Sequence, residues 1–118
     1  MTTTAEIAAE FTKLCAAGHF EEAQRYWSDD ITSLEPYPGP LATLQGRERV
    51  REKVAQWNQG WEMHGCNVQG PFLYGDQFAL TFVLDVTPKG APRTKMAEIG
   101  VYTVKDGKIV EERFFAGS

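Results

Sequence analysis

The 118 residues are 42% hydrophobic and 24% charged, which is ordinary for a single globular domain that buries a core. The formal net charge of −4 disfavours nucleic acid and anionic membrane surfaces as partners. No apolar run approaches the roughly 20 residues of a membrane span, the first residues lack a signal-peptide pattern, and Cys15 and Cys66 form no disulfide framework, so we expect a cytoplasmic location.

The first half of the chain predicts three helices and one strand. Apolar residues at helical spacing indicate a first helix from Thr4 to about Ala17, ended by Gly18, and a shorter second helix over about 19–27. The stretch DDITSLEP, residues 29–36, indicates a strand that the prolines of PYPGP end. A third helix is predicted to begin near Gly46, with its apolar stripe formed by Val50, Val54, Trp57 and Trp61.

The second half predicts four strands, over residues 62–75, 76–88, 94–104 and 108–117. The stretch KDGK, which joins the last two strands, is a strong hairpin signal. Gly70-Pro71 predicts a bend in the strand 62–75. Helices come first and a run of strands comes last, which favours an α+β fold. We therefore expect three N-terminal helices packed against a strongly curved mixed or antiparallel sheet, with a cavity between the two layers.

This order of elements carries a family resemblance. Together with the stretches YWSDDITSLEP, LQGRERVREKVAQW, GDQFALTFVLDVT and EIGVYTVKDGKIVEERFF, it resembles the nuclear-transport-factor-2-like superfamily, and most closely its SnoaL-like branch. The resemblance implies one SnoaL-like domain over residues 1–118, a cone-shaped α+β barrel with a pocket inside, and a homodimer formed through the outer sheet face. It does not imply one function, because the same fold serves isomerases, cyclases, dehydratases, hydrolases and binding subunits.

Glu98 lies at the middle of the predicted strand 94–104, which is apolar on both faces. A strand of this kind is usually covered on both sides. An ionised carboxylate there is costly unless it is paired or hydrated. Glu98 is therefore the first candidate for a functional or ion-paired group.

Asp85, on the preceding strand, is the second candidate. Registers that pair it with Met96 or with Glu98 place both carboxylates on one face, whereas a register that pairs it with Ala97 places them on opposite faces. On one buried face the two would repel and the pKa of one would rise, as a general acid or base at neutral pH requires. The alternative is that Asp85 meets solvent or Lys89 near the end of its strand.

Glu35 and Lys53 raise the same question on the first strand and the third helix. Glu35 shares a face with Ile31 and Ser33 and lies either at an exposed rim or in the pocket. The ketosteroid isomerases that the fold resembles take their general base from a carboxylate near that region, which implies a role for Glu35 by region only. Lys53 lies beside the apolar stripe; its ammonium either reaches solvent or points inward and neutralises Glu35 or Glu98.

His64, near the start of the strand 62–75, is the better candidate of the two histidines for moving a proton near neutral pH. The alternative is a hydrogen-bonded structural residue. No ligand spacing supports a metal site formed by His64, Asp85 and Glu98, so none is predicted. The chain contains neither a GxGxxG motif nor a P-loop, and we expect no cofactor.

The last hairpin decides which charged residue lies near Glu98. A two-residue turn at 106–107 would pair Tyr102 with Glu111 and place Arg113 diagonal to Glu98 as an ionic partner. A bulge would reverse this register. Tyr102, on the same face as Glu98, could then donate a hydrogen bond to a ligand oxygen or to the carboxylate.

The high aromatic content, 12%, serves either the core or a pocket for an apolar ligand. The predicted catalytic residues are Glu35, His64, Asp85 and Glu98. The predicted ligand-binding residues are Trp27, Lys53, Trp57, Trp61, Met96, Tyr102 and Phe114.

The sequence leaves two functions open. One is a cofactor-independent isomerase, cyclase, dehydratase or hydrolase that moves protons on a small apolar oxygenated molecule. The other is a non-catalytic, dimeric binding or accessory module in which Lys53 or Arg113 forms structural ion pairs with the glutamates. An enzyme requires a carboxylate that faces the cavity with no cation within reach, whereas the binding module tolerates one that is fully neutralised.

Overall fold

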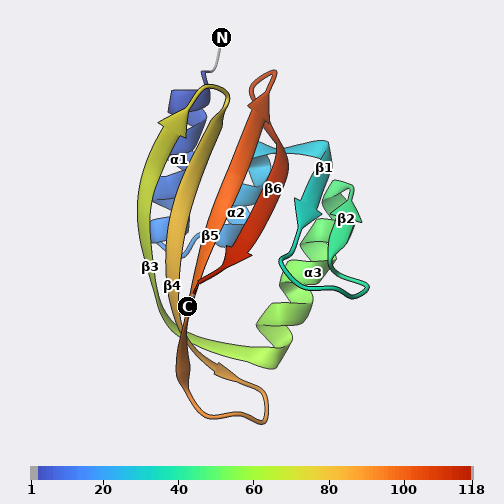
Figure 1. Ribbon diagram of the computed structural model, residues 1–118, viewed down its shortest axis with the longest axis vertical. Helices are drawn as coiled ribbons and strands as arrows, with labels where there is room; N and C mark the ends of the chain where they lie inside the picture. Colours follow the sequence, from blue (N-terminus) through green and yellow to red (C-terminus); the bar gives the residue numbers. More distant parts are fainter. Residues whose placement is uncertain (1–2, 118) are drawn as a thin grey trace.

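The computed structural model describes residues 3–117 and has the predicted α+β architecture (Figure 1). Six elements were predicted nearly as they stand: the first and third helices and the last four strands. In chain order the elements are α1 (Thr4–Ala16), α2 (Phe20–Ala23), a 3-10 turn (Gln24–Tyr26), β1 (Trp27–Leu34), β2 (Thr43–Gln45), α3 (Arg47–Gly60), β3 (Trp61–Tyr74), β4 (Gln77–Pro88), β5 (Thr94–Lys105) and β6 (Lys108–Ala116).

The N-terminal half departs from the prediction in two places. The second helix has only four residues before it becomes a 3-10 turn, so Trp27 opens β1 instead of closing a helix. A short strand, β2, follows the proline-rich loop and pairs with β1; its three residues are too few to give a periodic signal. The start of α1 is as predicted, because the Thr3 hydroxyl accepts a hydrogen bond from the backbone N–H of Glu6 (3.1 Å).

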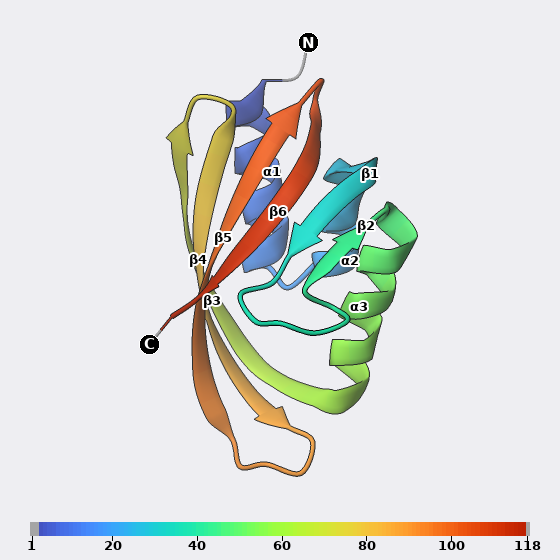
Figure 2. The ribbon, with the colours of Figure 1, turned by 45° about the vertical axis from the view of Figure 1, so that its right-hand side comes forward.

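The six strands form one curved sheet in the order β2-β1-β6-β5-β4-β3. Among the strand pairs of residues 3–117, only β1–β6 is parallel. The sheet does not close into a barrel, because β2 and β3 are free edges of the described sheet. The helices lie on its concave side, and the β4–β5 loop projects beyond them at the end opposite the N-terminus (Figure 2). No helix within residues 3–117 has both the length and the hydropathy that a membrane crossing requires.

The register between β4 and β5 corrects one prediction. Asp85 pairs with Lys95, and Glu98 pairs with Phe82. Because side chains alternate along a strand, Asp85 points to the outer face and Glu98 to the inner face. Of the alternatives left open for Asp85, the one that places both carboxylates on one face is therefore excluded; the hairpin is centred one step earlier than the registers considered.

The register between β5 and β6 contains the bulge that reverses the face of β6. Ile109 pairs with Val104, but the ladder then shifts, and Tyr102 pairs with Glu112. The extra residue, Val110, turns Glu112 inward and Arg113 outward. Of the two registers left open by the sequence, the structure has the bulged one, and Arg113 is not the ionic partner of Glu98.

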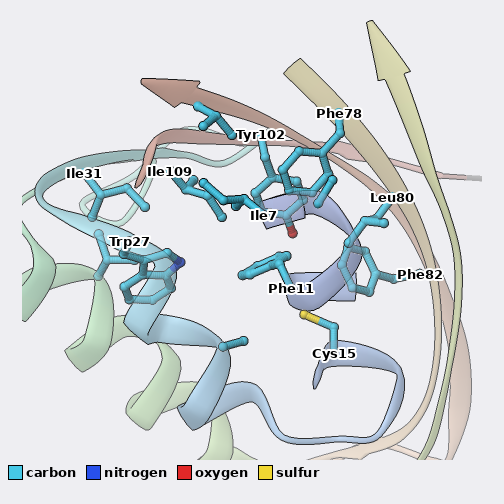
Figure 3. Close-up of a cluster of buried hydrophobic side chains, with 14 of the residues drawn as sticks. Ile7, Phe11, Cys15, Trp27, Ile31, Phe78, Leu80, Phe82, Tyr102 and Ile109 are labelled. Atoms are coloured by element: carbon cyan, nitrogen blue, oxygen red, sulfur yellow. The ribbon is translucent and has the colours of Figure 1, made fainter. Parts of the chain in front are cut away.

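The core fills the space between α1 and the inner face of the sheet (Figure 3). The Tyr102 ring packs against Phe11 and Phe78, with centroid separations of 4.9 and 5.0 Å. It also folds back over Gly100, where a Cβ atom would lie 2.8 Å from the phenolic oxygen. The glycine thus provides the room that this buried tyrosine needs. The largest fully buried side chains are Phe78, Ile7, Ile31, Leu80, Ile109, Val50 and Val86.

Candidate functional site

A cavity of about 160 Å³ lies between the inner face of the sheet, α3 and the helical segments near Phe20. Its wall is mostly apolar and rich in aromatic rings, which is typical of a site for a small organic ligand. Its charged lining residues, within the described chain, are Glu35, Lys53, Glu98 and Glu112. The remaining lining residues are Phe11, Cys15, Phe20, Ala23, Gln24, Trp27, Val54, Trp57, Asn58, Met63, Phe82, Leu84, Tyr102 and Phe114.

The Lys53 ammonium points into this cavity and organises its polar side. Nζ donates to Glu35 Oε1 at 2.8 Å and to Ser33 Oγ at 2.6 Å. The Ser33 hydroxyl in turn donates to Glu112 Oε2 at 2.7 Å, and Nζ lies 3.8 Å from the same oxygen. The side chains of Lys53 and Glu35 are each only 2% exposed. This is a buried, hydrogen-bonded ion pair with a second carboxylate attached through a hydroxyl.

The start of α3 is anchored so that Lys53 faces β1. Gly46 adopts a φ of 100°, which favours glycine, and its N–H donates to the Ile31 carbonyl (2.8 Å). The Arg47 guanidinium donates to the backbone carbonyls of Gln24 and Trp27. Two turns later, Lys53 reaches Ser33 and Glu35.

Two aromatic rings also accompany the ammonium. Lys53 Nζ lies 5.9 Å from the centroid of Trp57 and 5.5 Å from that of Phe114. Contacts of this kind favour a desolvated cation. They help to hold the charged lysine in an otherwise apolar wall.

Glu98 differs from Glu35 in having no such partner. Within residues 3–117 it forms no ion pair and no side-chain hydrogen bond. Burial raises the pKa of Glu98 to about 7, and the charges of Glu35 and Glu112 act in the same direction while Lys53 opposes them. Glu98 is thus a cavity carboxyl that gains and loses a proton near neutral pH.

Glu112 is the charged residue of the described cavity wall that the sequence prediction missed. It is 4% exposed, and burial raises its pKa against the opposing effects of Lys53 and the Ser33 hydrogen bond. One signal could have found it: Ile109 and Phe114 are both large and apolar, yet their odd separation prevents both from facing inward on a regular strand. A bulge between them restores the inward direction for both and brings Glu112 inward with Phe114.

The chain and its fold match those of known proteins. The family model of the SnoaL-like domain matches residues 1–116. The chain belongs to the SnoaL-like family. The chain is 48% identical to a candidate SnoaL-like polyketide cyclase from Mesorhizobium loti, whose crystal structure also bears the name carbohydrate phosphatase. The match covers 97% of this chain and 99% of that chain, with a TM-score of 0.93.

More distant SnoaL-like and NTF2-like structures share the fold. A candidate SnoaL-like polyketide cyclase from Jannaschia sp. CCS1 is 15% identical, with 91% and 83% of the chains covered and a TM-score of 0.76. An NTF2-like protein from Burkholderia thailandensis is 19% identical, with 99% and 92% covered and a TM-score of 0.82. These comparisons confirm the predicted family and fold. No functionally curated protein matches the chain.

Two of the predicted catalytic residues of this SnoaL-like domain lie away from the cavity. Asp85 faces outward and forms a bidentate pair with Arg93 (2.9 and 2.8 Å), which lowers the pKa of Asp85. The His64 Nε2 atom lies 2.7 Å from the Thr87 hydroxyl, near the same outer end of β4. Their placement corrects the prediction that His64 and Asp85 assist at the site.

The predicted ligand-binding residues divide in a similar way. Trp27, Lys53, Trp57, Tyr102 and Phe114 line the cavity. Among the described lining residues neither Trp61 nor Met96 occurs, which corrects their assignment. Trp61 stacks on Trp57 outside the cavity, with a centroid separation of 6.4 Å. Met96 lies on the inner face of β5 but beyond the cavity and is 41% exposed.

The remaining titratable cavity residues of the SnoaL-like chain favour their neutral forms. Burial raises the pKa of the Cys15 thiol to about 12 and that of the Tyr102 phenol well above its ordinary value. Neither group supplies a nucleophile or a base at neutral pH. The chemistry available to the cavity is therefore proton transfer by carboxyl groups, next to a lysine ammonium whose charge is balanced by Glu35.

Proposed function

We propose that this SnoaL-like protein is a cofactor-independent enzyme that transfers a proton on a small, largely apolar, oxygenated molecule. The observation that carries the proposal is the contrast between Glu35 and Glu98. Glu35 is paired with Lys53 at 2.8 Å, whereas Glu98 faces the same cavity without an ion-pair partner in residues 3–117. Glu98 is the general base, and its conjugate acid returns the proton.

The raised pKa of Glu98, about 7, supports this role. A general base is most effective when its pKa lies near the working pH, because it is then ionised often enough and still takes the proton strongly. Isomerisation, aldol cyclisation and dehydration can all begin with removal of a proton next to a carbonyl group. The names of the candidate cyclases from Mesorhizobium and Jannaschia are consistent with this reaction class.

The charge of the cavity supports a neutral substrate. Three carboxyl groups face one ammonium among the described lining residues. An anion such as a phosphate ester would meet this excess of carboxylates and would lose its hydration. We therefore favour proton transfer on a neutral molecule over phosphate ester hydrolysis.

A second function is supported by the Lys53–Glu35 pair. A binding or accessory module without turnover can keep such a pair as structure. In that case the cavity binds a small molecule, and Glu98 only tunes its affinity. Both cysteines are free thiols, which suits the reducing cytoplasm in either case.

Proton exchange separates the two functions. We would incubate the protein in D₂O with a panel of cyclic ketones and follow deuterium incorporation next to the carbonyl by NMR. The wild-type protein is expected to accelerate exchange for at least one ketone, with a rate that rises through about pH 7 as Glu98 ionises. Glu98→Gln is expected to slow that exchange about 10²–10⁴-fold.

Glu52→Gln is the matched control, because Glu52 is an exposed residue of α3 and does not line the cavity. It is expected to leave the exchange rate unchanged. Binding of a panel ketone without any exchange would support the binding module. Equal exchange rates for the wild type and Glu98→Gln would contradict the role of Glu98.

We also propose that two copies associate through the outer sheet face. Val83, Ile99 and Phe115 lie on that face of β4, β5 and β6 and are 41%, 41% and 46% exposed. Ile99 and Phe115 are directly paired across the strands, and Phe72 of β3 adds a fourth exposed apolar side chain. An apolar patch spread over four neighbouring strands favours an interface.

Sedimentation equilibrium tests the dimer. The wild-type protein is expected to sediment with twice the mass of the chain, and Ile99→Lys to shift it toward the monomer, because a buried unpaired ammonium is costly. Lys95→Glu, on the same outer face near the end of β5, serves as the exposed control. A monomeric wild-type protein at all concentrations would contradict the proposal.

A further inference from the structure

Trp27 carries an unsatisfied hydrogen-bond donor in the cavity wall. Among residues 3–117, two buried side-chain polar atoms have no hydrogen-bond partner: the hydroxyl oxygen of Thr12 and the indole nitrogen of Trp27. Of these two residues only Trp27 lines the cavity. Trp27 is 4% exposed. A buried N–H without an acceptor destabilises the fold, so it is an unusual feature to keep.

The position of this indole is well defined. The Trp27 carbonyl accepts a hydrogen bond from the Arg47 guanidinium, and its backbone pairs with Ile109 of β6. In Figure 3 the indole nitrogen lies on the edge of the ring that faces Phe11, another residue of the cavity wall. The Trp27 backbone is therefore held by the scaffold, and the indole N–H points toward the interior (Figure 3).

The partner of this donor must be an acceptor, and the other charges of the cavity limit its kind. An indole N–H can only donate. A ligand carboxylate or phosphate would satisfy it but would be opposed by Glu35, Glu98 and Glu112, against the single ammonium of Lys53. A neutral oxygen, such as that of a ketone, satisfies the donor without this repulsion.

We infer that the Trp27 indole N–H binds the carbonyl oxygen of a neutral, largely apolar ligand and thereby fixes its orientation in the cavity. The inference rests on the proposed function, because it names the substrate class of that site. It assigns Trp27 a polar, specific contact in addition to its apolar surface.

The same contact has a catalytic consequence. When the Glu98 carboxylate removes a proton from the carbon next to the carbonyl, the C–H electron pair forms a carbon–carbon double bond and the carbonyl oxygen becomes an enolate oxygen. A donor fixed against that oxygen stabilises the charge as it develops. Protonated Glu98 then returns its proton to carbon, and the cycle closes without a cofactor.

NMR of the indole N–H groups tests the contact directly. The chain has three tryptophans, so a ¹⁵N-labelled sample gives three indole signals, and Trp27→Phe identifies that of Trp27 by its loss. We would titrate 1-indanone and, as a matched ligand without oxygen, indane. The Trp27 indole proton is expected to shift downfield with 1-indanone and to move little with indane.

Affinities give the second measurement. Trp27→Phe is expected to weaken binding of 1-indanone about fivefold to tenfold, as for loss of a neutral hydrogen bond, and to change that of indane less than twofold. Trp61→Phe is the control; Trp61 stacks on Trp57 outside the cavity and should alter neither affinity. Indane-1-carboxylate is expected to bind at least tenfold more weakly than 1-indanone.

Three results would overturn the inference: equal weakening of both neutral ligands in Trp27→Phe, no indole shift with 1-indanone, or preferred binding of the carboxylate. Failure of the proposed function is distinguishable, because it is measured separately as Glu98-dependent deuterium exchange. A ketone that exchanges normally in Trp27→Phe, with unchanged affinity, would overturn the inference and leave the proposed function intact.

Discussion

Lys53→Met is expected to lower the free energy of unfolding at pH 8 by about 3–5 kcal/mol, the cost of removing one partner of a buried ion pair. The ammonium accompanies the carboxylate of Glu35 at 2.8 Å and that of Glu112 at 3.8 Å, and it is 2% exposed. Without it, the ionisable acid–base groups that remain on the polar side of the described cavity wall are the carboxyls of Glu35, Glu98 and Glu112. Urea denaturation followed by tryptophan fluorescence measures the loss.

The pH dependence of this stability loss and a second substitution test whether charge is its cause. At pH 5 the loss is expected to shrink, because burial raises the pKa of Glu98 and of Glu112, and their protonation at lower pH removes part of the repulsion that Lys53 had offset. Adding Glu35→Gln to Lys53→Met should recover part of the stability, since it removes the charge left unpaired. Arg49→Met, an exposed cation on the same helix, is the control and should cost less than about 0.5 kcal/mol. An equal loss at pH 5 and pH 8 would mean that packing, not charge, explains the effect.

Glu98→Gln is expected to stabilise the protein above neutral pH while it slows catalysis. Folding raises the pKa of Glu98 from 4.5 to about 7, so between these values the folded state binds a proton that the unfolded state has lost. The free energy of unfolding therefore falls as the pH rises through this window. Ionisation of Glu98 lowers it by about 3 kcal/mol in total. The glutamine variant lacks this loss.

The measurement is the difference in unfolding free energy between Glu98→Gln and the wild type across pH 5 to 8. The difference is expected to grow with pH in favour of the variant and to level off above about pH 7. Glu52→Gln, whose carboxylate is exposed, should show no such trend. A constant difference would mean that Glu98 has an ordinary pKa, and the proposed base would lose its physical basis.

The helical part of the site could be predicted because helix periodicity is local. The apolar stripe of α3 placed Lys53 beside the core without any knowledge of the sheet. Its inward direction and its pairing with Glu35 could not be predicted, since they depend on how Gly46 and Arg47 anchor α3 to β1. The family and the fold class were predictable from the order of the elements.

The sheet part of the site was harder to predict, because a one-residue change of register exchanges the two faces of a strand. Glu98 was found since it interrupts an apolar pattern within its own strand. Asp85 was misplaced by the hairpin register, and Glu112 was missed because a bulge changes the face. His64 was chosen for its titration range, which carries no information on direction.

The extra residue in β6, Val110, determines which of the following side chains of that strand face the cavity. On an uninterrupted β6 ladder the same sequence would present Glu111 and Arg113 to the interior and Glu112 to the solvent, so a second cation would face the cavity beside Lys53. Transfer of residue roles between homologues therefore depends on where a single gap is placed after the Asp106-Gly107 turn. An insertion or deletion there would change which β6 residues face the cavity without any point substitution.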